Sequence, residues 1–206
     1  MMINALPQIV ILLFSIVFHE VAHGRVALWR GDTTARDAGR LTLNPLPHID
    51  IFGTILFPLF LIITGSSVLF GWAKPVPVNP LRFREIKKDM ALVGASGPVS
   101  NFLLAIVAGV FLRVTVKTFG PSHVLVQAFS FAVLINLVLA FFNLIPIPPL
   151  DGSRIVMGFL PDDLAEQYSR LERYGFIIIF ALLFLGLFRL VLFPIVSVFY
   201  YLIIGG

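Results

Sequence analysis

The stretch Phe18-His19-Glu20-Val21-Ala22-His23-Gly24 lies inside an apolar run that covers residues 6–28. In hydrocarbon an unpaired polar group costs several kcal/mol, so two histidines and a carboxylate at this depth need partners that stabilise them. A helix places residues i and i+4 on one face, so the imidazoles of His19 and His23 can close on one ion. Glu20 lies about 100° around the helix from His19, where it can reach a metal-bound water without being a ligand. The pattern H-E-x-x-H therefore predicts a zinc site.

The composition indicates an integral membrane protein in contact with the lipid bilayer. Apolar residues make up 58% of the chain, charged residues 13%, and the mean hydropathy is +0.98. In such a protein the net charge of +4 reports loop topology, so we predict no nucleic-acid partner. The sequence has no cysteine, which excludes disulfides and thiolate metal sites. Any metal is therefore held by histidine and carboxylate.

The apolar runs predict an all-α polytopic protein of the cell membrane, folded as one domain over residues 1–206. We expect a helix bundle of about four to five spans, because a helix of roughly 20 apolar residues crosses a bilayer. Core helices are predicted over residues 6–28, 90–116 and 124–144. The C-terminal apolar segment, residues 176–204, is interrupted by Arg189 and Pro194 and is interpreted as one kinked span.

The polar segment between residues 31 and 50 follows the basic end of the first span, which we place on the cytoplasmic side. Residues 39–45 alternate between polar and apolar side chains before Pro45 and Pro47 interrupt the pattern. We therefore predict a small β ribbon at the cytoplasmic membrane surface.

A catalytic zinc needs three protein ligands and one open position. His48, His123 and the acidic residues are the candidates for the third ligand. Asp151 is the better choice because residues 143–152 contain three prolines in four positions, and non-helical backbone at membrane depth is tolerated only inside protein or around a cavity. Gly152 follows Asp151 and allows a turn that aims the carboxylate back into the bundle. The alternative is a chance histidine pair and an ordinary Asp-Gly turn.

Three motifs resemble the site-2 protease family of intramembrane zinc metalloproteases. Residues 18–24 resemble its first motif, and Asn143-Leu144-Ile145-Pro146-Ile147-Pro148-Pro149-Leu150-Asp151-Gly152 resembles its N-x-x-P-x-P-x-L-D-G motif. Between them, Ser96-Gly97-Pro98-Val99-Ser100-Asn101 is similar to the family pattern S-G-P-x-x-N. Residues 43–50 and 71–78 resemble a compact prokaryotic branch without PDZ or CBS domains. The resemblance covers about residues 6–154.

The resemblance implies that His19, His23 and Asp151 bind one catalytic Zn²⁺ and that Glu20 is the general base. It also implies that the substrate is a transmembrane segment of another protein. The asparagines of the family pattern imply possible contacts of Asn101 and Asn143 with the substrate or the transition state. A helix–helix hydrogen bond is the alternative for each asparagine.

His48 has two readings as well. It is a possible substrate-channel group beside the site, or it caps the predicted surface ribbon.

The number of membrane crossings before the core helices decides how residues 51–78 are placed. If residues 51–70 crossed the membrane fully, the core helices 90–116 and 124–144 would each run the other way. Asp151 would then emerge on the face opposite the basic end of the first span, and the ligands could not meet. We therefore predict that residues 51–70 enter the membrane and that residues 71–78 return extended, as a re-entrant element whose basic flanks share the cytoplasmic side. The active site is then buried toward the cytoplasmic side. The extended segment offers backbone groups to which a substrate can add as a strand.

These observations predict an intramembrane zinc endopeptidase that hydrolyses peptide bonds in or near transmembrane segments of membrane proteins. The alternative is a metal-binding membrane transporter that uses the same ligands without protease activity. A catalytically silent scaffold is a third reading, which the presence of all four chemical residues disfavours. Glu20 discriminates between the first two, because a protease needs this carboxylate as a base and a transporter does not.

Overall fold

The computed structural model describes residues 5–64 and 71–205, and this part of the chain is helical without any strand. The long helices are α1 (Ala5–Trp29), α4 (Ile86–Phe119), α5 (Val124–Asn143), α8 (Glu172–Phe184) and α9 (Leu187–Ile204). The shorter ones are α2 (Thr34–Asp37), α3 (Phe57–Ile63), α6 (Asp151–Phe159) and α7 (Asp162–Ser169). Three further turns of helix are η1 (Leu46–His48), η2 (Ile51–Leu56) and η3 (Pro80–Arg82).

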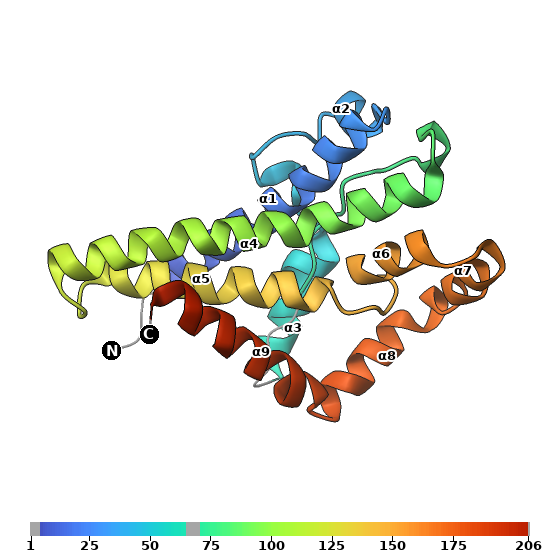
Figure 1. Cartoon of the computed structure of the whole chain (residues 1–206). Coiled ribbons are helices and arrows are strands. Elements are labelled where there is room, and N and C mark those ends of the chain that lie inside the picture. The colour runs from blue at the N-terminus through green and yellow to red at the C-terminus, as the bar shows by residue number, and fades with distance from the viewer. Residues whose placement is uncertain (1–4, 65–70, 206) are drawn as a thin grey trace.

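Three described helices, α1, α4 and α5, are long and apolar enough to cross a membrane. The protein is therefore a multi-pass membrane protein, as its composition predicts. Helix α4 is central, because it contacts α1, α5, α6 and α9. It runs antiparallel to α5 and to α1, so the end of α1, the start of α4 and the end of α5 lie together toward the side of α2 and α6 (Figure 1).

The apolar core lies where α4, α5 and α9 meet. Small residues of α4, Ala105 and Ala108, pack there against Val133 and Leu137 of α5 and against Val196 of α9. Small side chains allow helix backbones to approach closely, which matters in lipid because the hydrophobic effect does not drive helices together there.

Buried ion pairs and hydrogen bonds join the chain segments at the end of the bundle where α1 ends, α4 begins and α6 lies. We call this the ligand-bearing end, because Asp151, a candidate zinc ligand, is the first residue of α6. The fully buried carboxylate of Asp89 on α4 accepts a 2.5 Å bond from Arg30 Nε, just after α1. Asp32 accepts hydrogen bonds from Thr34 and, at 2.7 Å, from the backbone N–H of Asn79. Burial alone would raise the pKa of Asp32, but these hydrogen bonds outweigh it and hold the pKa below its ordinary value. The charged form of Asp32 thus ties the α1–α2 loop to the chain that leads into α4.

The predicted β ribbon is wrong for the described chain, in which residues 39–50 form turns and the helix η1. The Thr42 hydroxyl accepts from the backbone N–H of Asn44, and the Asn44 side chain accepts from the N–H of Leu46. Side chains therefore satisfy backbone groups locally, which competes with strand pairing. Pro45 and Pro47 also have no N–H to donate to a ladder.

Residues 51–64 and 71–79 are compatible with the predicted re-entrant element. Helices η2 and α3 together cover residues 51–63, which is about 20 Å at 1.5 Å per residue and too short for a bilayer core of about 30 Å. The following described segment, residues 71–79, is extended, and its Trp72 N–H donates to Gly53 O at 3.1 Å. Residues 65–70 of the predicted element lie outside the described residues, so membrane re-entry stays a prediction.

The C-terminal apolar segment, which is interpreted as one kinked span, bends sharply between α8 and α9. Helices α8 and α9 form an angle of 81°, so the described chain contains three candidate spans, or four if this bent pair is one span. The break falls at Gly186, whose φ of 70° is left-handed and favours glycine, whereas Pro194 lies inside α9 without ending it.

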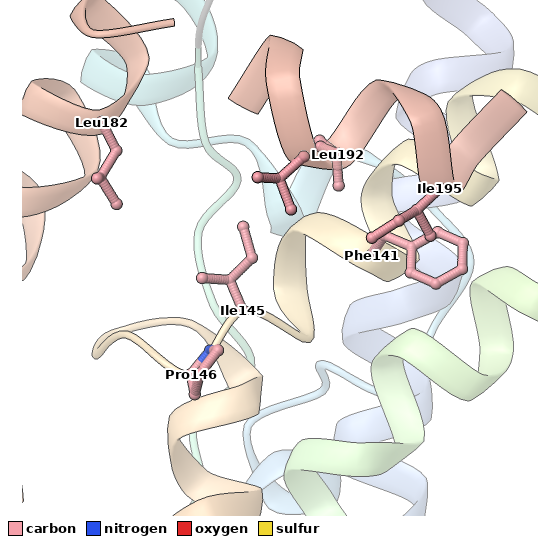
Figure 2. A pocket seen from close by; sticks show the side chains of 7 residues that line it. Phe141, Ile145, Pro146, Leu182, Leu192 and Ile195 are labelled. Atoms are coloured by element: carbon pink, nitrogen blue, oxygen red, sulfur yellow. The ribbon is translucent and has the colours of Figure 1, made fainter. Parts of the chain in front are cut away.

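A cavity of about 290 Å³ lies between the end of α5, α8 and α9. Figure 2 shows the Ile145 side chain pointing toward the space between Leu182 of α8 and Leu192 of α9. Its lining is apolar and includes none of the candidate zinc ligands.

Candidate metal centre

His19 and His23 occupy successive turns on one face of α1, as their spacing predicts. Their Nε2 atoms lie 3.0 Å apart, and the imidazole planes are almost perpendicular at 89°. Both side chains are buried. The His23 Nδ1 lies 2.7 Å from the carbonyl oxygen of Val93 on α4. Because a carbonyl only accepts, Nδ1 carries the proton and the His23 Nε2 lone pair faces His19.

Asp151 brings a carboxylate to the same point from a distant part of the chain. It is the first residue of α6, and its Oδ2 lies 3.0 Å from His19 Nε2 and 3.1 Å from His23 Nε2. The three ligand atoms all lie within 4.8 Å of one another. The structure therefore brings together the three residues that the sequence suggests as ligands.

Glycine at two positions leaves room for the ligand group. A Cβ at Gly152 would lie 2.2 Å from Leu144 O, so only glycine allows the turn after α5 to fold back on α6. A Cβ at Gly97 of α4 would lie 2.5 Å from both imidazoles. Gly97 therefore forms the wall against which the histidine pair rests.

The donor set fits a zinc ion. Two imidazole nitrogens and one carboxylate oxygen form a catalytic zinc set with one position left open. Ligand atoms of a tetrahedral zinc site are roughly 3.3 Å apart, close to the 3.0 and 3.1 Å separations here. The buried Asp151 Oδ2 has no hydrogen-bond partner in the described protein. Burying a carboxylate oxygen without a hydrogen-bond partner costs free energy unless a cation binds it.

Glu20 is held by the extended segment 71–79. Its Oε2 accepts a 2.8 Å hydrogen bond from the backbone N–H of Val76. The preceding carbonyls of Lys74 and Pro75 accept from the buried guanidinium of Arg40 at 2.7 and 3.3 Å. The peptide group between Pro75 and Val76 thus lies between a cation and the Glu20 carboxylate. Sequence reasoning missed this role of Arg40, because the contact depends on how the extended segment passes α1.

The asparagines have different surroundings. Asn101 on α4 is fully buried, and its Oδ1 lies 2.6 Å from His19 Nδ1. Asn143 at the end of α5 is partly exposed and donates to Leu139 O of its own helix at 3.0 Å. No described hydrogen bond joins Asn143 to the ligand group, and a substrate contact of either residue stays a prediction.

The other two histidines lie outside the ligand group. His48 is buried at the end of η1, its Nε2 lies 3.0 Å from Thr42 O, and burial lowers its pKa below the ordinary value. His123 precedes α5, where its Nδ1 accepts from the N–H of Leu125. This position is at the opposite end of the bundle from α6 (Figure 1).

Comparison with known proteins identifies the family. The model of peptidase family M50 matches residues 114–186, a range that contains Asp151. The Bacillus subtilis (strain 168) protein named "Putative zinc metalloprotease YwhC" is 41% identical over 202 residues, which is 95% of this chain and 88% of that protein. The chain belongs to peptidase family M50.

Two further relatives of the M50 chain have names of the same form. Rip2 of Mycolicibacterium smegmatis is 28% identical over 173 residues, covering 83% of this chain and 64% of Rip2. MJ0611 of Methanocaldococcus jannaschii is 36% identical over 140 residues, covering 68% of this chain and 63% of MJ0611. The chain thus spans just under two thirds of these two relatives. No solved structure matches it.

Family membership confirms the resemblance to the site-2 proteases. The protein is a zinc metalloprotease of the membrane, and the buried group of His19, His23 and Asp151 can bind one metal ion.

Proposed function

We propose that this M50 protein is an intramembrane endopeptidase that cleaves other membrane proteins in or near their transmembrane segments. In this proposal His19, His23 and Asp151 hold the zinc and Glu20 is the general base. The convergence of three buried ligand atoms beside a carboxylate on a membrane-spanning helix carries the proposal. A site of this kind on a membrane-spanning helix suits a substrate that is itself in the bilayer.

Each side chain has a defined task in this mechanism. The bound metal supplies Lewis-acid chemistry to the reaction. Glu20 Oε2 is fixed by the Val76 N–H, which leaves Oε1 to take a proton from the attacking water. The water oxygen bonds to the scissile carbonyl carbon, the C–N bond breaks, and the same proton passes to the leaving amine. Asp151 contributes a negative charge that stabilises the cation among neutral imidazoles.

The extended segment 71–79 supports a substrate bound as a strand. On one edge, the N–H groups of Trp72, Lys74 and Val76 already donate to Gly53, His48 and Glu20. On the other edge Pro75 and Pro77 have no N–H. A substrate strand at that edge therefore supplies most of the N–H donors itself, which requires its transmembrane helix to unwind locally.

Removal and return of the metal test the reaction in liposomes that contain the purified protein and a transmembrane reporter. We expect a chelator to abolish cleavage and stoichiometric Zn²⁺ to restore it. A reporter with a soluble helix in place of the span should be cleaved much more slowly. Cleavage that persists after complete zinc removal would contradict the proposed site, and preference for the soluble reporter would contradict the membrane substrate.

We also propose that the ligand-bearing end of the bundle faces the cytoplasm. Cationic side chains concentrate at that end and are few at the other, which is the bias that orients spans in a membrane. The ligand-bearing end carries Arg30, Arg82, Arg84, Lys87 and Lys88, and the opposite end carries Arg113 and Lys117.

Cysteine labelling tests this orientation, and the natural sequence contains no cysteine that would interfere. Leu81→Cys lies at the basic end, where Leu81 is 84% exposed, and Ser122→Cys lies in the exposed turn between α4 and α5. An impermeant maleimide should label Ser122→Cys in intact spheroplasts and Leu81→Cys only in inverted vesicles. The reverse pattern would overturn the assignment.

A further inference from the structure

A continuous hydrogen-bonded chain of side chains runs from α1 through α5 and α4 to the imidazole of His19. The Ser15 hydroxyl of α1 bonds to Ile11 O at 2.8 Å. Asn136 Nδ2 of α5 donates to Ser15 Oγ at 2.9 Å, and Asn101 Nδ2 of α4 donates to Asn136 Oδ1 at 2.8 Å. Asn101 Oδ1 then meets His19 Nδ1 at 2.6 Å.

The first bond sets the direction of all the others. Ile11 O can only accept, so the Ser15 hydroxyl donates to it and offers a lone pair to Asn136. The Asn136 amide therefore presents Nδ2 to Ser15 and Oδ1 to Asn101, and a second bond from its Nδ2 to Ala132 O at 2.9 Å fixes the same orientation. Asn101 in turn presents Oδ1 to His19, whose Nδ1 must carry the proton. The His19 Nε2 lone pair is then directed at Asp151 and His23.

We propose that Ser15, Asn136 and Asn101 are positioning residues that fix the tautomer and ring orientation of His19 for metal binding. The inference rests on the proposed role of His19 as a zinc ligand. Exposure is 1% for Ser15, 2% for Asn136 and 0% for Asn101, so a substrate cannot reach them in this structure. Bonds of this kind between membrane helices add little stability, because the separated helices also find partners. Metal-binding histidines, by contrast, depend on an acceptor at the other ring nitrogen.

His19 and His23 both carry the proton on Nδ1, but different groups accept it. His23 depends on a backbone carbonyl, that of Val93, which no side-chain substitution removes. His19 depends on side chains from two other helices. Substitution of Ser15, Asn136 or Asn101 should therefore affect His19 and leave His23 in place.

Zinc affinity, measured by competition with a chelator of known affinity, tests the proposal independently of proteolysis. We expect Asn101→Leu to weaken zinc binding about 10- to 100-fold, the range for partners of metal-binding histidines. Asn136→Leu should have a smaller effect and Ser15→Ala the smallest. Thr115→Val is the matched control, because Thr115 is a buried polar residue of α4 whose hydroxyl, among the described residues, bonds only to Phe111 O of its own helix.

The double variant Asn101→Leu/Asn136→Leu separates a relay from general destabilisation. If Asn136 acts through Asn101, the double variant binds zinc no more weakly than Asn101→Leu alone, whereas independent effects multiply. The Co²⁺-substituted forms should show altered d–d spectra in the same order. Affinity of Asn136→Leu and Ser15→Ala equal to that of Thr115→Val, or multiplying effects, would overturn the proposal. If the variants bind zinc with the expected affinities but the wild-type protein cleaves no membrane reporter, only the proposed function would be contradicted.

Discussion

Replacement of Glu20 by glutamine is expected to lower the rate of reporter cleavage by about 100- to 10,000-fold, the usual contribution of a general base. Bound zinc should stay at the wild-type stoichiometry. Glutamine keeps a side-chain oxygen that can accept the Val76 N–H, so the contact with segment 71–79 survives. What is lost is the negative charge that takes a proton from water. The measurement is the initial cleavage rate in liposomes together with the zinc content of the same preparation.

Glu85→Gln is the matched control for this substitution. Glu85 is exposed and forms an ion pair with Lys88 at the surface, so we expect wild-type cleavage and zinc content. The same pair of variants tests the transporter alternative. Metal flux that is unchanged in Glu20→Gln, with no cleavage by wild type, would favour a transporter. Equal cleavage by wild type and Glu20→Gln would exclude Glu20 as the base.

Replacement of Gly97 by alanine is expected to weaken zinc binding at least about 10-fold and to reduce cleavage with it. The new Cβ would lie 2.5 Å from His19 Nε2 and from His23 Cε1. The rings cannot move aside without losing their bonds to Asn101 and Val93. Helix propensity acts in the other direction, since alanine is favoured over glycine by about 1 kcal/mol. Overpacking costs about 1–3 kcal/mol, so we expect the steric effect to dominate at this position.

Gly109→Ala is the control for overpacking in the same helix. Its Cβ would lie 2.2 Å from Ile203 Cγ2, a contact with α9 that is about 18 Å along α4 from Gly97. We expect lower thermal stability in detergent for Gly109→Ala but normal zinc affinity. Equal zinc affinities for the two alanine variants would show that the histidine pair tolerates displacement.

The chemistry of the site was largely predictable because its signals are local. The i, i+4 spacing of His19 and His23 fixes their common face, and the turn at residues 144–150 is indicated by prolines at membrane depth. The β ribbon was predicted wrongly because alternation alone does not supply a partner strand. In the described chain, side chains of Thr42 and Asn44 satisfy the backbone there.

The break at Gly186 shows a similar limit. The sequence marks Arg189 and Pro194 as the most conspicuous interruptions of the apolar segment. Gly186 has a left-handed φ that ends the regular helix, whereas α9 continues through Pro194, so the bend lies between α8 and α9.

The sequence by itself determined a membrane-spanning helix with the H-E-x-x-H pattern and a carboxylate beyond the last core helix. Only the tertiary structure decided how these groups are held. The Asn136–Asn101–His19 contacts depend on the rotation of three helices about their axes, and the Val76–Glu20 contact depends on the path of an extended segment. Such pairings are not encoded by spacing along the chain, because residues 35 to 82 positions apart meet only when the chain folds.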